Sequence, residues 1–360
     1  MLNLLSYLIL LFSLLSCSSS KNISSRNNTI IQETPITRIV QSNSSSFADS
    51  TELSIAIINN GEVEFHGFKI INGELTETQN QASTFETGSL TKVFTATILA
   101  SKVIKNKLNL NDTINSLYPF SFKNNQIITF LELANHTSGL PRLPSNLKMT
   151  DFTNPYKGYD DNLLADYLKN ELSIDTTKQY SYSNLGFGII AKTLELANNQ
   201  TFENQLQQLI FNKYGMHHSS TSKENIDKRL VSGRDYSGTV VPNWEFASLS
   251  GAGGIYSSCE DLSKFILAQF NDENKELNLT RKATFTVNEN LKMGLGWHIL
   301  TKDSSELYWH NGGTGGYTSS MVFDMDKKKG VIVLSNVSAF YIDSKNIDEM
   351  AFELLRLDDN

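Results

Sequence analysis

Apolar residues follow two different periods along this chain, and the change of period separates sheet-forming ends from a helix-forming middle. Near the start, the apolar run Leu53–Ile58 is followed by the turn signal Asn59–Gly61 and a second run, Glu62–Ile71. Two such runs around an Asn-Gly turn predict a β-hairpin. Next, the apolar residues of Thr91–Val103 recur at helical spacing, which predicts an α-helix.

The middle of the chain, about residues 112–245, has helical character. Its four helical stretches are separated by loops that contain proline and glycine. They are Ile128–Ala134, Asn162–Asn170, Gly186–Ala197 and Phe202–Lys213. We therefore expect a mostly helical lobe in this part of the chain.

The last part returns to a sheet pattern. Leu307–His310, Tyr317–Asp324 and Gly330–Asn336 are predicted strands, and Asp348–Leu357 is a predicted closing helix. Strands at both ends with helices between them favour one antiparallel sheet built from the two chain ends, flanked by helices, with the helical lobe inserted. The predicted fold class is α/β, of the α+β kind, in one domain over residues 51–360.

A leader precedes this domain. Leu2–Leu15 is almost wholly apolar, too short for a comfortable membrane span but as long as the core of a signal peptide. We therefore expect residues 1–16 to be a signal peptide. Leu14–Cys17 also resembles the lipobox of bacterial lipoproteins. That resemblance implies that Cys17 becomes a lipid-carrying N-terminus that anchors the protein to a membrane of the bacterial cell envelope.

One feature qualifies this interpretation of the leader. No Lys or Arg precedes the apolar run, so an ordinary cleaved signal or an uncleaved anchor stays open. Each of these alternatives also places the body of the protein outside the cytoplasm. The following residues 17–50 are rich in Ser, Asn and Thr, and we predict that they form a flexible tether.

Composition and charge exclude few classes of protein. Hydrophobic residues make up 39% of the 360 residues, which is ample for a buried core. The net charge of -7 and the pI near 5.5 give no sign of the basic face that a nucleic-acid partner would need. The two cysteines, Cys17 and Cys259, are too few for a disulfide framework, and we interpret Cys259 as a small buried hydrophobe.

The first chemically suggestive pair is Ser89 and Lys92, in the stretch FETGSLTK. Residues three apart on a helix share a face, so these side chains can meet at the start of the predicted helix. Free backbone N–H groups there would favour a developing oxyanion. A serine hydroxyl needs a base, and a lysine serves only where its pKa is lowered. Alone, the pair would equally suit an N-cap serine and a solvated lysine.

Two further sequence elements support a catalytic role for Ser89 and Lys92. Tyr182–Asn184 precedes a predicted helix, with a tyrosine that can relay protons and an asparagine that can orient a carbonyl or an amine. His310–Gly316 (HNGGTGG) ends a predicted strand, and its glycines leave room for an extended substrate along the strand edge. Taken singly, each element has an alternative interpretation. Tyr182–Asn184 could be a loop whose tyrosine packs on the core and whose asparagine caps the helix, and His310–Gly316 could be a glycine-rich hairpin turn.

In this order, the three elements resemble the serine β-lactamase and penicillin-binding-protein superfamily. More narrowly, they resemble the branch related to class C β-lactamases, which includes DD-peptidases and some esterases. The resemblance covers roughly residues 52–340, and it extends to the stretches Leu131–Leu140 and Gly251–Ser258. It implies a β-lactamase/transpeptidase-like fold and a reaction without a cofactor.

The resemblance also implies a role for each matching residue. Ser89 would be the acylated nucleophile, and Lys92 and Tyr182 would carry its proton. Asn184 would hold the substrate amide, and the backbone N–H groups of Ser89 and Gly313 would form the oxyanion hole.

The third element departs from the lysine-containing motif of β-lactamases. His310 stands where they usually have a lysine, and it should be largely neutral near pH 7. Asn311 replaces the usual threonine. We predict that His310, Gly312 and Gly313 contact the substrate, and the departures favour a peptidase or esterase over a dedicated β-lactamase.

The expected activity is a two-step acyl transfer, in which an acyl-enzyme on Ser89 is hydrolysed by water. The expected substrate is an amide or ester such as a D-Ala-D-Ala peptide, a cell-wall peptide or a β-lactam. Three alternatives stay open: a sensor that acylates without turnover, a true class C β-lactamase, and a catalytically inactive binding module. We expect the loops Pro141–Gly158 and Asn271–Asn290 to shape the pocket.

Other groupings of polar residues are not interpreted as sites. His217 and His218 lack a third ligand at a useful spacing, so no metal site is predicted. Asp324 and Asp326 lie beside three lysines and are interpreted as a charged hairpin tip. No glycine-rich loop follows a strand and opens a helix, so no nucleotide site is predicted.

Overall fold

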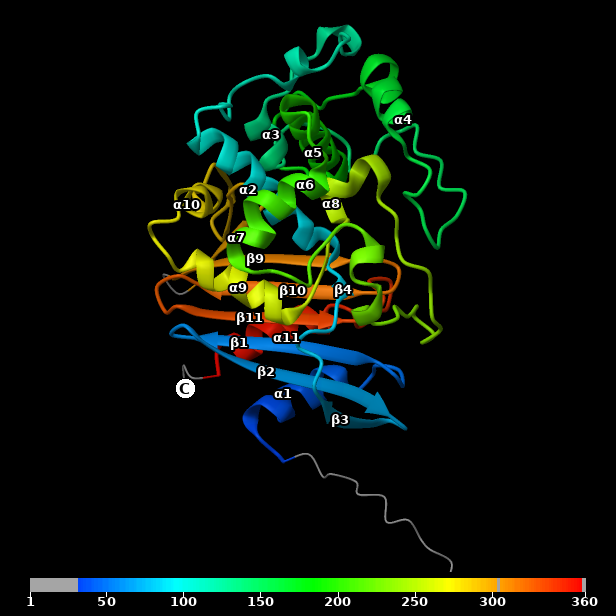
Figure 1. Ribbon diagram of the computed structural model, residues 1–360, viewed down its shortest axis with the longest axis vertical. Coiled ribbons are helices and arrows are strands. Elements are labelled where there is room, and N and C mark those ends of the chain that lie inside the picture. Colours follow the sequence, from blue (N-terminus) through cyan, green and yellow to red (C-terminus); the bar gives the residue numbers. More distant parts are fainter. Residues whose placement is uncertain (1–31, 303–304, 358–360) are drawn as a thin grey trace, which may run out of the picture. The chain divides into compact units, whose positions relative to one another are not determined.

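The computed structural model describes residues 32–302 and 305–357 (Figure 1). The predicted signal peptide and Cys17 lie outside the described residues. Among the described helices, none is both long enough and apolar enough to span a bilayer.

A nine-stranded sheet joins the two ends of the described chain, with the strand order β3-β2-β1-β11-β10-β9-β8-β7-β6. Every neighbouring pair is antiparallel, and β1 pairs with β11 so that Ile55 lies opposite Val333. This confirms the predicted sheet built from both ends. The strands are β1 Glu52–Asn59, β2 Glu62–Ile71, β3 Glu74–Thr78, β6 Phe285–Asn288, β7 Leu291–Met293, β8 His298–Lys302, β9 Ser305–Gly313, β10 Thr318–Asp324 and β11 Lys329–Ser335.

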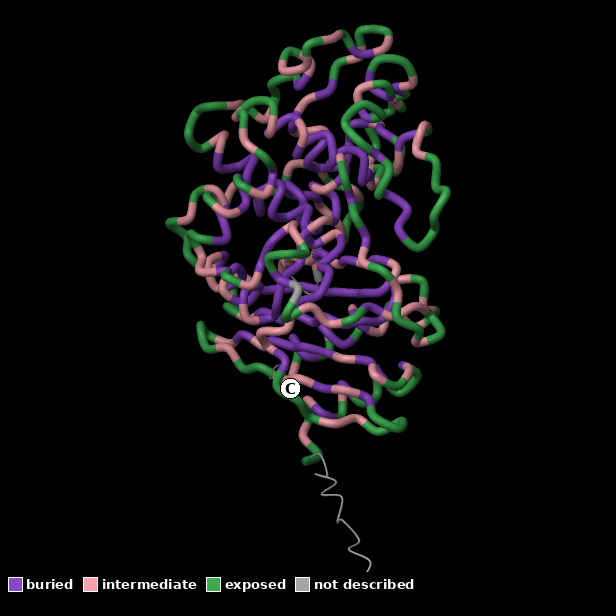
Figure 2. Tube along the Cα trace, turned by 45° about the vertical axis from the view of Figure 1, so that its right-hand side comes forward, coloured by how far each residue is buried: buried purple, intermediate pink, exposed green. Residues whose placement is uncertain are grey.

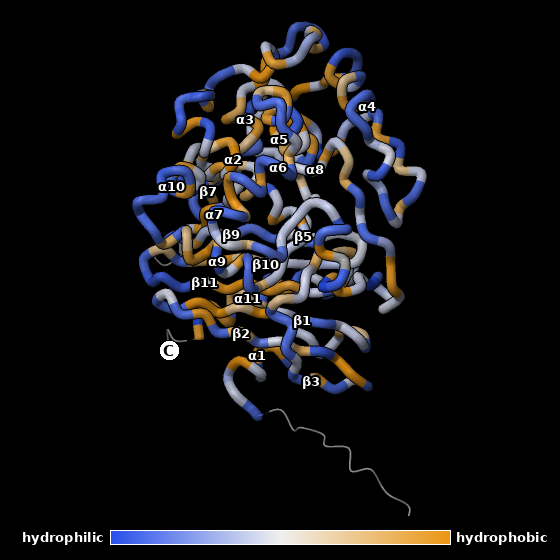
Figure 3. The backbone as a smooth tube through the Cα atoms, viewed as in Figure 1, coloured by the Kyte–Doolittle hydropathy of each residue, from blue (hydrophilic) through white to orange (hydrophobic). Residues whose placement is uncertain are grey.

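Both faces of the sheet are covered, because its central strands are apolar on both sides. Met321 and Phe323 of β10 face the larger core, whereas Val322 faces a smaller one. Figure 2 shows buried segments, in purple, along the strands and the adjoining helices, and Figure 3 shows hydrophobic residues along β11. The helices are α1 Pro35–Ser44, α2 Thr91–Ile104, α3 Phe130–Ala134, α4 Asp161–Asp166, α5 Asn184–Asn198, α6 Phe202–Leu206, α7 Asn212–Tyr214, α8 Ser250–Gly253, α9 Cys259–Gln269, α10 Lys275–Arg281 and α11 Asn346–Leu355.

The four helical stretches predicted for the middle of the chain are present. The second is α4 continued by a π-helical turn, Tyr167–Glu171, and the fourth is α6, another such turn and α7. These helices share the larger core with the sheet. Strands β3, β6, β7 and β8 were not predicted, because they are short and lie towards the sheet edges, where polar residues obscure the alternation.

The prediction of a flexible tether is wrong for the described part of residues 17–50. Helix α1 begins with a capping box between Thr34 and Thr37 and has proline in its first turn. Val40 is fully buried in the smaller core, and Asn43 Nδ2 donates to Glu353 Oε2 of α11 at 3.1 Å. Among the many polar residues, three apolar ones at helical spacing (Ile36, Ile39 and Val40) suffice to dock this helix.

Candidate active site

Ser89 lies in a tight turn between a short strand and the helix α2. The strand β4 (Phe85–Glu86) leads into the 3₁₀ turn Gly88–Leu90, and α2 begins at Thr91. Gly88 has a φ of +51°, and a side chain there would come within 2.5 Å of the backbone nitrogen of Gly313. Glycine therefore allows both the turn and the close approach of β9.

The end of β9 lies directly against this turn. A side chain at Gly312 would collide with the carbonyl oxygen of Thr87 and lie 2.8 Å from the backbone nitrogen of Ser89. Ser319 Oγ of β10 donates to the same Thr87 oxygen at 2.9 Å and holds the two segments together. The backbone N–H groups of Ser89 and Gly313, which we predicted as the oxyanion hole, thus belong to facing segments.

The side chain of Lys92 is fully buried beside Ser89. Its Nζ atom lies 2.9 Å from Ser89 Oγ, 2.9 Å from Asn184 Oδ1 and 2.7 Å from the carbonyl oxygen of Ala252. Burial, and secondly the positive charge of Arg142, hold the pKa of Lys92 well below its usual value. A neutral amine can donate to Asn184 and Ala252 and still accept the proton of Ser89.

Tyr182 is the second titratable group beside Ser89. Its hydroxyl lies near the Ser89 side chain, and Lys92 Nζ lies 4.9 Å from its ring centroid. Burial raises the pKa of Tyr182, so the phenol holds its proton near neutral pH. The ring of His136 lies 4.4 Å from the ring of Tyr182 and fixes its orientation.

Asn184 is the first residue of α5, and Ser183 caps that helix. The Asn184 Oδ1 atom accepts from Lys92, and its backbone N–H donates to the Arg142 carbonyl oxygen at 3.0 Å. The sequence prediction that Asn184 can orient the lysine amine therefore agrees with its position.

His310 occupies a different place from the one expected. It is fully buried and does not line the cavity, whereas its neighbours Asn311, Gly312 and Gly313 do. Its Nδ1 atom lies 2.6 Å from the Asn311 carbonyl oxygen. Burial holds the pKa of His310 well below its usual value, so the imidazole is neutral. The predicted contact of this side chain with substrate is therefore corrected: His310 lies behind the cavity wall.

Ser89 opens into a cavity of about 840 Å³. Tyr182, Asn184 and the end of β9 line it. Six residues of the loop Pro141–Gly158 also line it, in agreement with the prediction for that loop: Arg142, Leu143, Met149, Phe152, Pro155 and Tyr156. The predicted contribution of Asn271–Asn290 is wrong, because this segment folds as α10 and β6 and lines no part of the cavity. Arg142 lies in the predicted loop Pro141–Gly158, although no motif singled it out. Sequence reasoning missed three other lining residues that belong to no motif: Trp244, Phe340 and Asp348.

Comparison with known proteins identifies this arrangement. The family model described as Beta-lactamase matches residues 47–347. The chain belongs to the beta-lactamase family. This confirms the resemblance to serine β-lactamases and penicillin-binding proteins that the motifs indicated.

Solved structures and curated relatives of this beta-lactamase family member agree on the fold. A class C beta-lactamase superposes with a TM-score of 0.76 and 19% identity, covering 91% of this chain and 96% of that one. A beta-lactamase/D-alanine carboxypeptidase from Yersinia pestis gives a TM-score of 0.72 and 22% identity, covering 89% and 95%. A beta-lactamase from Pseudomonas fluorescens is 23% identical over 330 residues, covering 80% of this chain and 89% of that protein.

Protein flp from Staphylococcus aureus (strain COL) is another relative. It is 23% identical over 307 residues, which cover 80% of this chain and 60% of flp. This beta-lactamase family member thus spans about 60% of the length of flp.

A second cavity, of about 1010 Å³, lies beyond Trp244 and Phe246, which line both cavities. It contains none of the residues predicted for the active site. In this beta-lactamase family member, the predicted chemistry is therefore concentrated in the cavity that contains Ser89.

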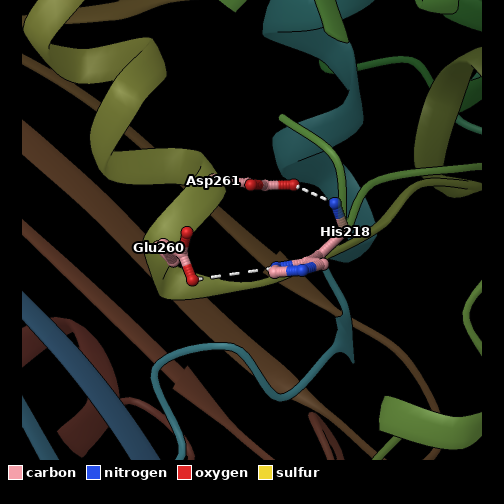
Figure 4. A group of neighbouring side chains, drawn as sticks. All are labelled: His218, Glu260 and Asp261. Atoms are coloured by element: carbon pink, nitrogen blue, oxygen red, sulfur yellow. Dashed lines mark hydrogen bonds and ion pairs between the residues drawn. The ribbon is translucent and has the colours of Figure 1, made fainter. Parts of the chain in front are cut away.

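One cluster elsewhere has the donor atoms of a metal site. His218 lies beside Glu260 and Asp261 of α9 (Figure 4), so the expectation that it lacks further ligands is corrected. Asp261 Oδ2 accepts from the His218 backbone N–H and from Ser219 Oγ. Lys264 Nζ donates to Glu260 at 3.1 Å and to Asp261 at 3.2 Å. The lysine therefore supplies the positive charge that these carboxylates need.

Proposed function

We propose that this protein is a serine acyl-hydrolase that forms an acyl-enzyme on Ser89. The observation that carries the proposal is the hydrogen bond of 2.9 Å between Ser89 Oγ and the fully buried Nζ atom of Lys92. A buried lysine with a lowered pKa is a base that can activate a serine hydroxyl near neutral pH.

In the acylation step, neutral Lys92 accepts the proton of Ser89 as Oγ forms a bond with the substrate carbonyl carbon. The electron pair of the carbonyl bond moves to its oxygen, and the backbone N–H groups of Ser89 and Gly313 stabilise that oxyanion. The intermediate then collapses and the bond to the leaving group breaks. Tyr182 gives its proton to the leaving group and recovers one from the Lys92 ammonium, so both groups return to their starting state.

In the second step, water attacks the ester carbon of the acyl-enzyme. Its proton passes to neutral Lys92, and the bond to Ser89 Oγ breaks when that oxygen takes this proton back, directly or through Tyr182. The products are the free acid and the regenerated serine. Each proton is carried by a group that lies within reach of Ser89 Oγ, so this cycle requires no other acid or base.

The first substrates to test are a β-lactam, a D-Ala-D-Ala peptide and an aryl ester. One structural neighbour is named a beta-lactamase/D-alanine carboxypeptidase, which supports the first two. The neutral His310 supports the ester, because no lysine stands at that position to attract a substrate carboxylate.

The test compares the wild type with Ser89→Ala on all three substrates, with mass spectrometry of the intact protein. We expect at least one substrate to be hydrolysed, with an adduct on the wild type only. The variant should lose at least about a thousandfold in kcat/KM. Equal rates in the two proteins would overturn the proposal. An adduct without steady-state turnover would identify a sensor instead.

We also propose that the protein is exported and anchored through lipid on Cys17. The support is the apolar run Leu2–Leu15 followed by Ser16 and Cys17. Expression of the full chain with labelled palmitate tests it in a bacterial host. The label should appear in the wild type and disappear in Cys17→Ser, and an unlabelled wild type would contradict the anchor.

A further inference from the structure

Among the described residues that line the cavity around Ser89, three are Arg, Lys, Asp or Glu: Arg142, Lys345 and Asp348. Lys345 already forms an ion pair of 3.2 Å with the neighbouring Glu349 of α11. Arg142 differs, because within residues 32–302 and 305–357 no carboxylate forms an ion pair with it. A solvent-exposed guanidinium in a cavity, without a carboxylate partner, can bind an anion from outside the protein.

The guanidinium group of Arg142 lies close to the reacting atoms. Its central carbon is 5.0 Å from the centroid of the Tyr182 ring, and the hydroxyl of that ring reaches the Ser89 side chain. The backbone is fixed as well, since the Arg142 carbonyl oxygen accepts from the N–H groups of Asn184 and Leu185. A molecule whose carbonyl reaches Ser89 can therefore place an anionic group at Arg142, since both residues line the same cavity.

The cavity lining beside β9 carries a carboxyl group, that of Asp348. Asp348 Oδ2 accepts from Asn311 Nδ2 at 2.7 Å, and Asp348 Oδ1 accepts from Trp309 Nε1 at 3.3 Å. Burial raises the pKa of Asp348 above its usual value, and these two bonds favour the charged carboxylate and hold it in the cavity lining. The neighbouring His310 is neutral and buried, so it offers no positive charge to balance Asp348.

We propose that Arg142 is the residue that binds a carboxylate of the substrate, and that Asp348 excludes a carboxylate from the part of the cavity beside Asn311. This inference rests on the proposed acyl-hydrolase function and deepens it. The substrate class is then an ester or amide with one carboxylate on the side of Arg142. The group beside Asn311 is uncharged or positively charged, because a second carboxylate there would be repelled.

The test uses two aryl esters that differ by one charge: the mono-4-nitrophenyl ester of adipic acid and its methyl-capped counterpart. The quantity compared is the ratio of kcat/KM for the charged ester to kcat/KM for the neutral one. Both esters use the same Ser89 and Lys92, so an effect of a substitution on the pKa of Lys92 cancels in this ratio.

Arg142→Gln should lower the ratio by about tenfold, which is the scale of one charge-assisted hydrogen bond. Arg142→Lys should lower the ratio less than Arg142→Gln does, whereas Asp348→Asn should raise the ratio several-fold. The matched control is Lys148→Gln, an exposed cation in the same loop as Arg142. This residue lies outside the cavity lining, and its substitution should leave the ratio unchanged.

Calorimetry with monomethyl adipate measures the same recognition without turnover, in the Ser89→Ala background. There Arg142→Gln should weaken binding by about tenfold. Equal affinity, or an ester ratio unchanged in Arg142→Gln, would overturn the role of Arg142. A ratio unchanged or lowered in Asp348→Asn would overturn the role of Asp348. Failure of the proposed function looks different: both esters would then react equally with the wild type and with Ser89→Ala, and calorimetry alone would decide the role of Arg142.

Discussion

The Nζ atom of Lys92 lies 2.9 Å from Oγ of Ser89 and is closed off from solvent. An ammonium ion in such a place loses its hydration, and this loss lowers the pKa of the lysine. The same burial that makes Lys92 costly to charge makes it available as a base. Replacing Lys92 should therefore have two measurable effects: a loss of activity and no loss of stability.

Lys92→Met should abolish activity without unfolding the protein. The substitution preserves most of the side-chain volume and removes a buried polar group, while Ser89 loses its base. We expect kcat/KM to fall by roughly a thousandfold, with a melting temperature equal to or above that of the wild type. Ser89→Ala sets the floor of the assay, and a variant that keeps more than a tenth of the wild-type rate would exclude Lys92 as the base.

Gly312→Ala tests the contact between β9 and the nucleophile turn. A methyl group at this position collides with the carbonyl oxygen of Thr87, so one of the two segments must move. We expect the free energy of unfolding to fall by about 1–3 kcal/mol. We also expect kcat to fall, because the displaced segment carries the backbone N–H of Gly313. Urea unfolding and steady-state kinetics measure the two effects.

Gly158→Ala is the matched control for that substitution. No atom lies within 4 Å of a methyl group placed at position 158, and its φ is not in the left-handed region. This variant should match the wild type in both measurements. If Gly312→Ala behaved in the same way, the close packing of β9 against Thr87 would be refuted.

Glu86 gives the fold a dependence on pH. Its carboxyl group is buried behind the nucleophile turn, and burial raises its pKa from 4.5 to about 7. The folded state therefore keeps a proton that the unfolded chain releases near pH 4.5. The stabilisation from Glu86 is fully present below that pH, is lost as the pH rises towards 7, and is absent above 7. The difference is on the order of 3 kcal/mol.

Glu86→Gln should remove this dependence. The amide oxygen can still accept from Asn243 Nδ2 and from the backbone N–H of Trp244, as Oε1 of Glu86 does. Urea unfolding at pH 5 and pH 8 should therefore show a smaller difference in the variant than in the wild type. Glu349→Gln, at an exposed position of α11, should leave the difference unchanged. An unchanged difference in Glu86→Gln would show that another group is responsible.

Exposed aromatic side chains at the cavity mouth should favour substrates with an apolar acyl group. Phe152 is 77% exposed and Phe340 is 68% exposed, and both line the cavity. Replacing either by Ser should raise KM for esters with long acyl chains, by roughly 0.8 kcal/mol for each CH₂ that loses its contact. Stability should be unaffected. Ile342→Ser is the control, because Ile342 is 86% exposed but lies outside the cavity; equal KM values across the chain-length series would contradict this role.

The contact between Ser89 and Lys92 could be predicted from the sequence, because the two residues are close along the chain and lie at the start of a clearly marked helix. Ser89 and Lys92 are separated by one helical turn, and Tyr182 directly precedes a well-marked helix. The orientation of His310 could not be predicted, since the glycines that follow it interrupt the alternation that would tell the two faces of a strand apart. Arg142 and Asp348 carry no motif and come from a loop and a closing helix, so only the folded chain brings them to one cavity.

Because β1 pairs with β11, the centre of the sheet cannot form until the chain has been made as far as Ser335. The bond from Ser319 to Thr87 spans 232 residues, so the nucleophile turn also waits for the last strands. Long-range pairing of this kind folds slowly. During synthesis, Ser89 and Lys92 are therefore present in the chain long before the strands that lie against their turn, and the candidate site is assembled only after β9 and β10 have been made.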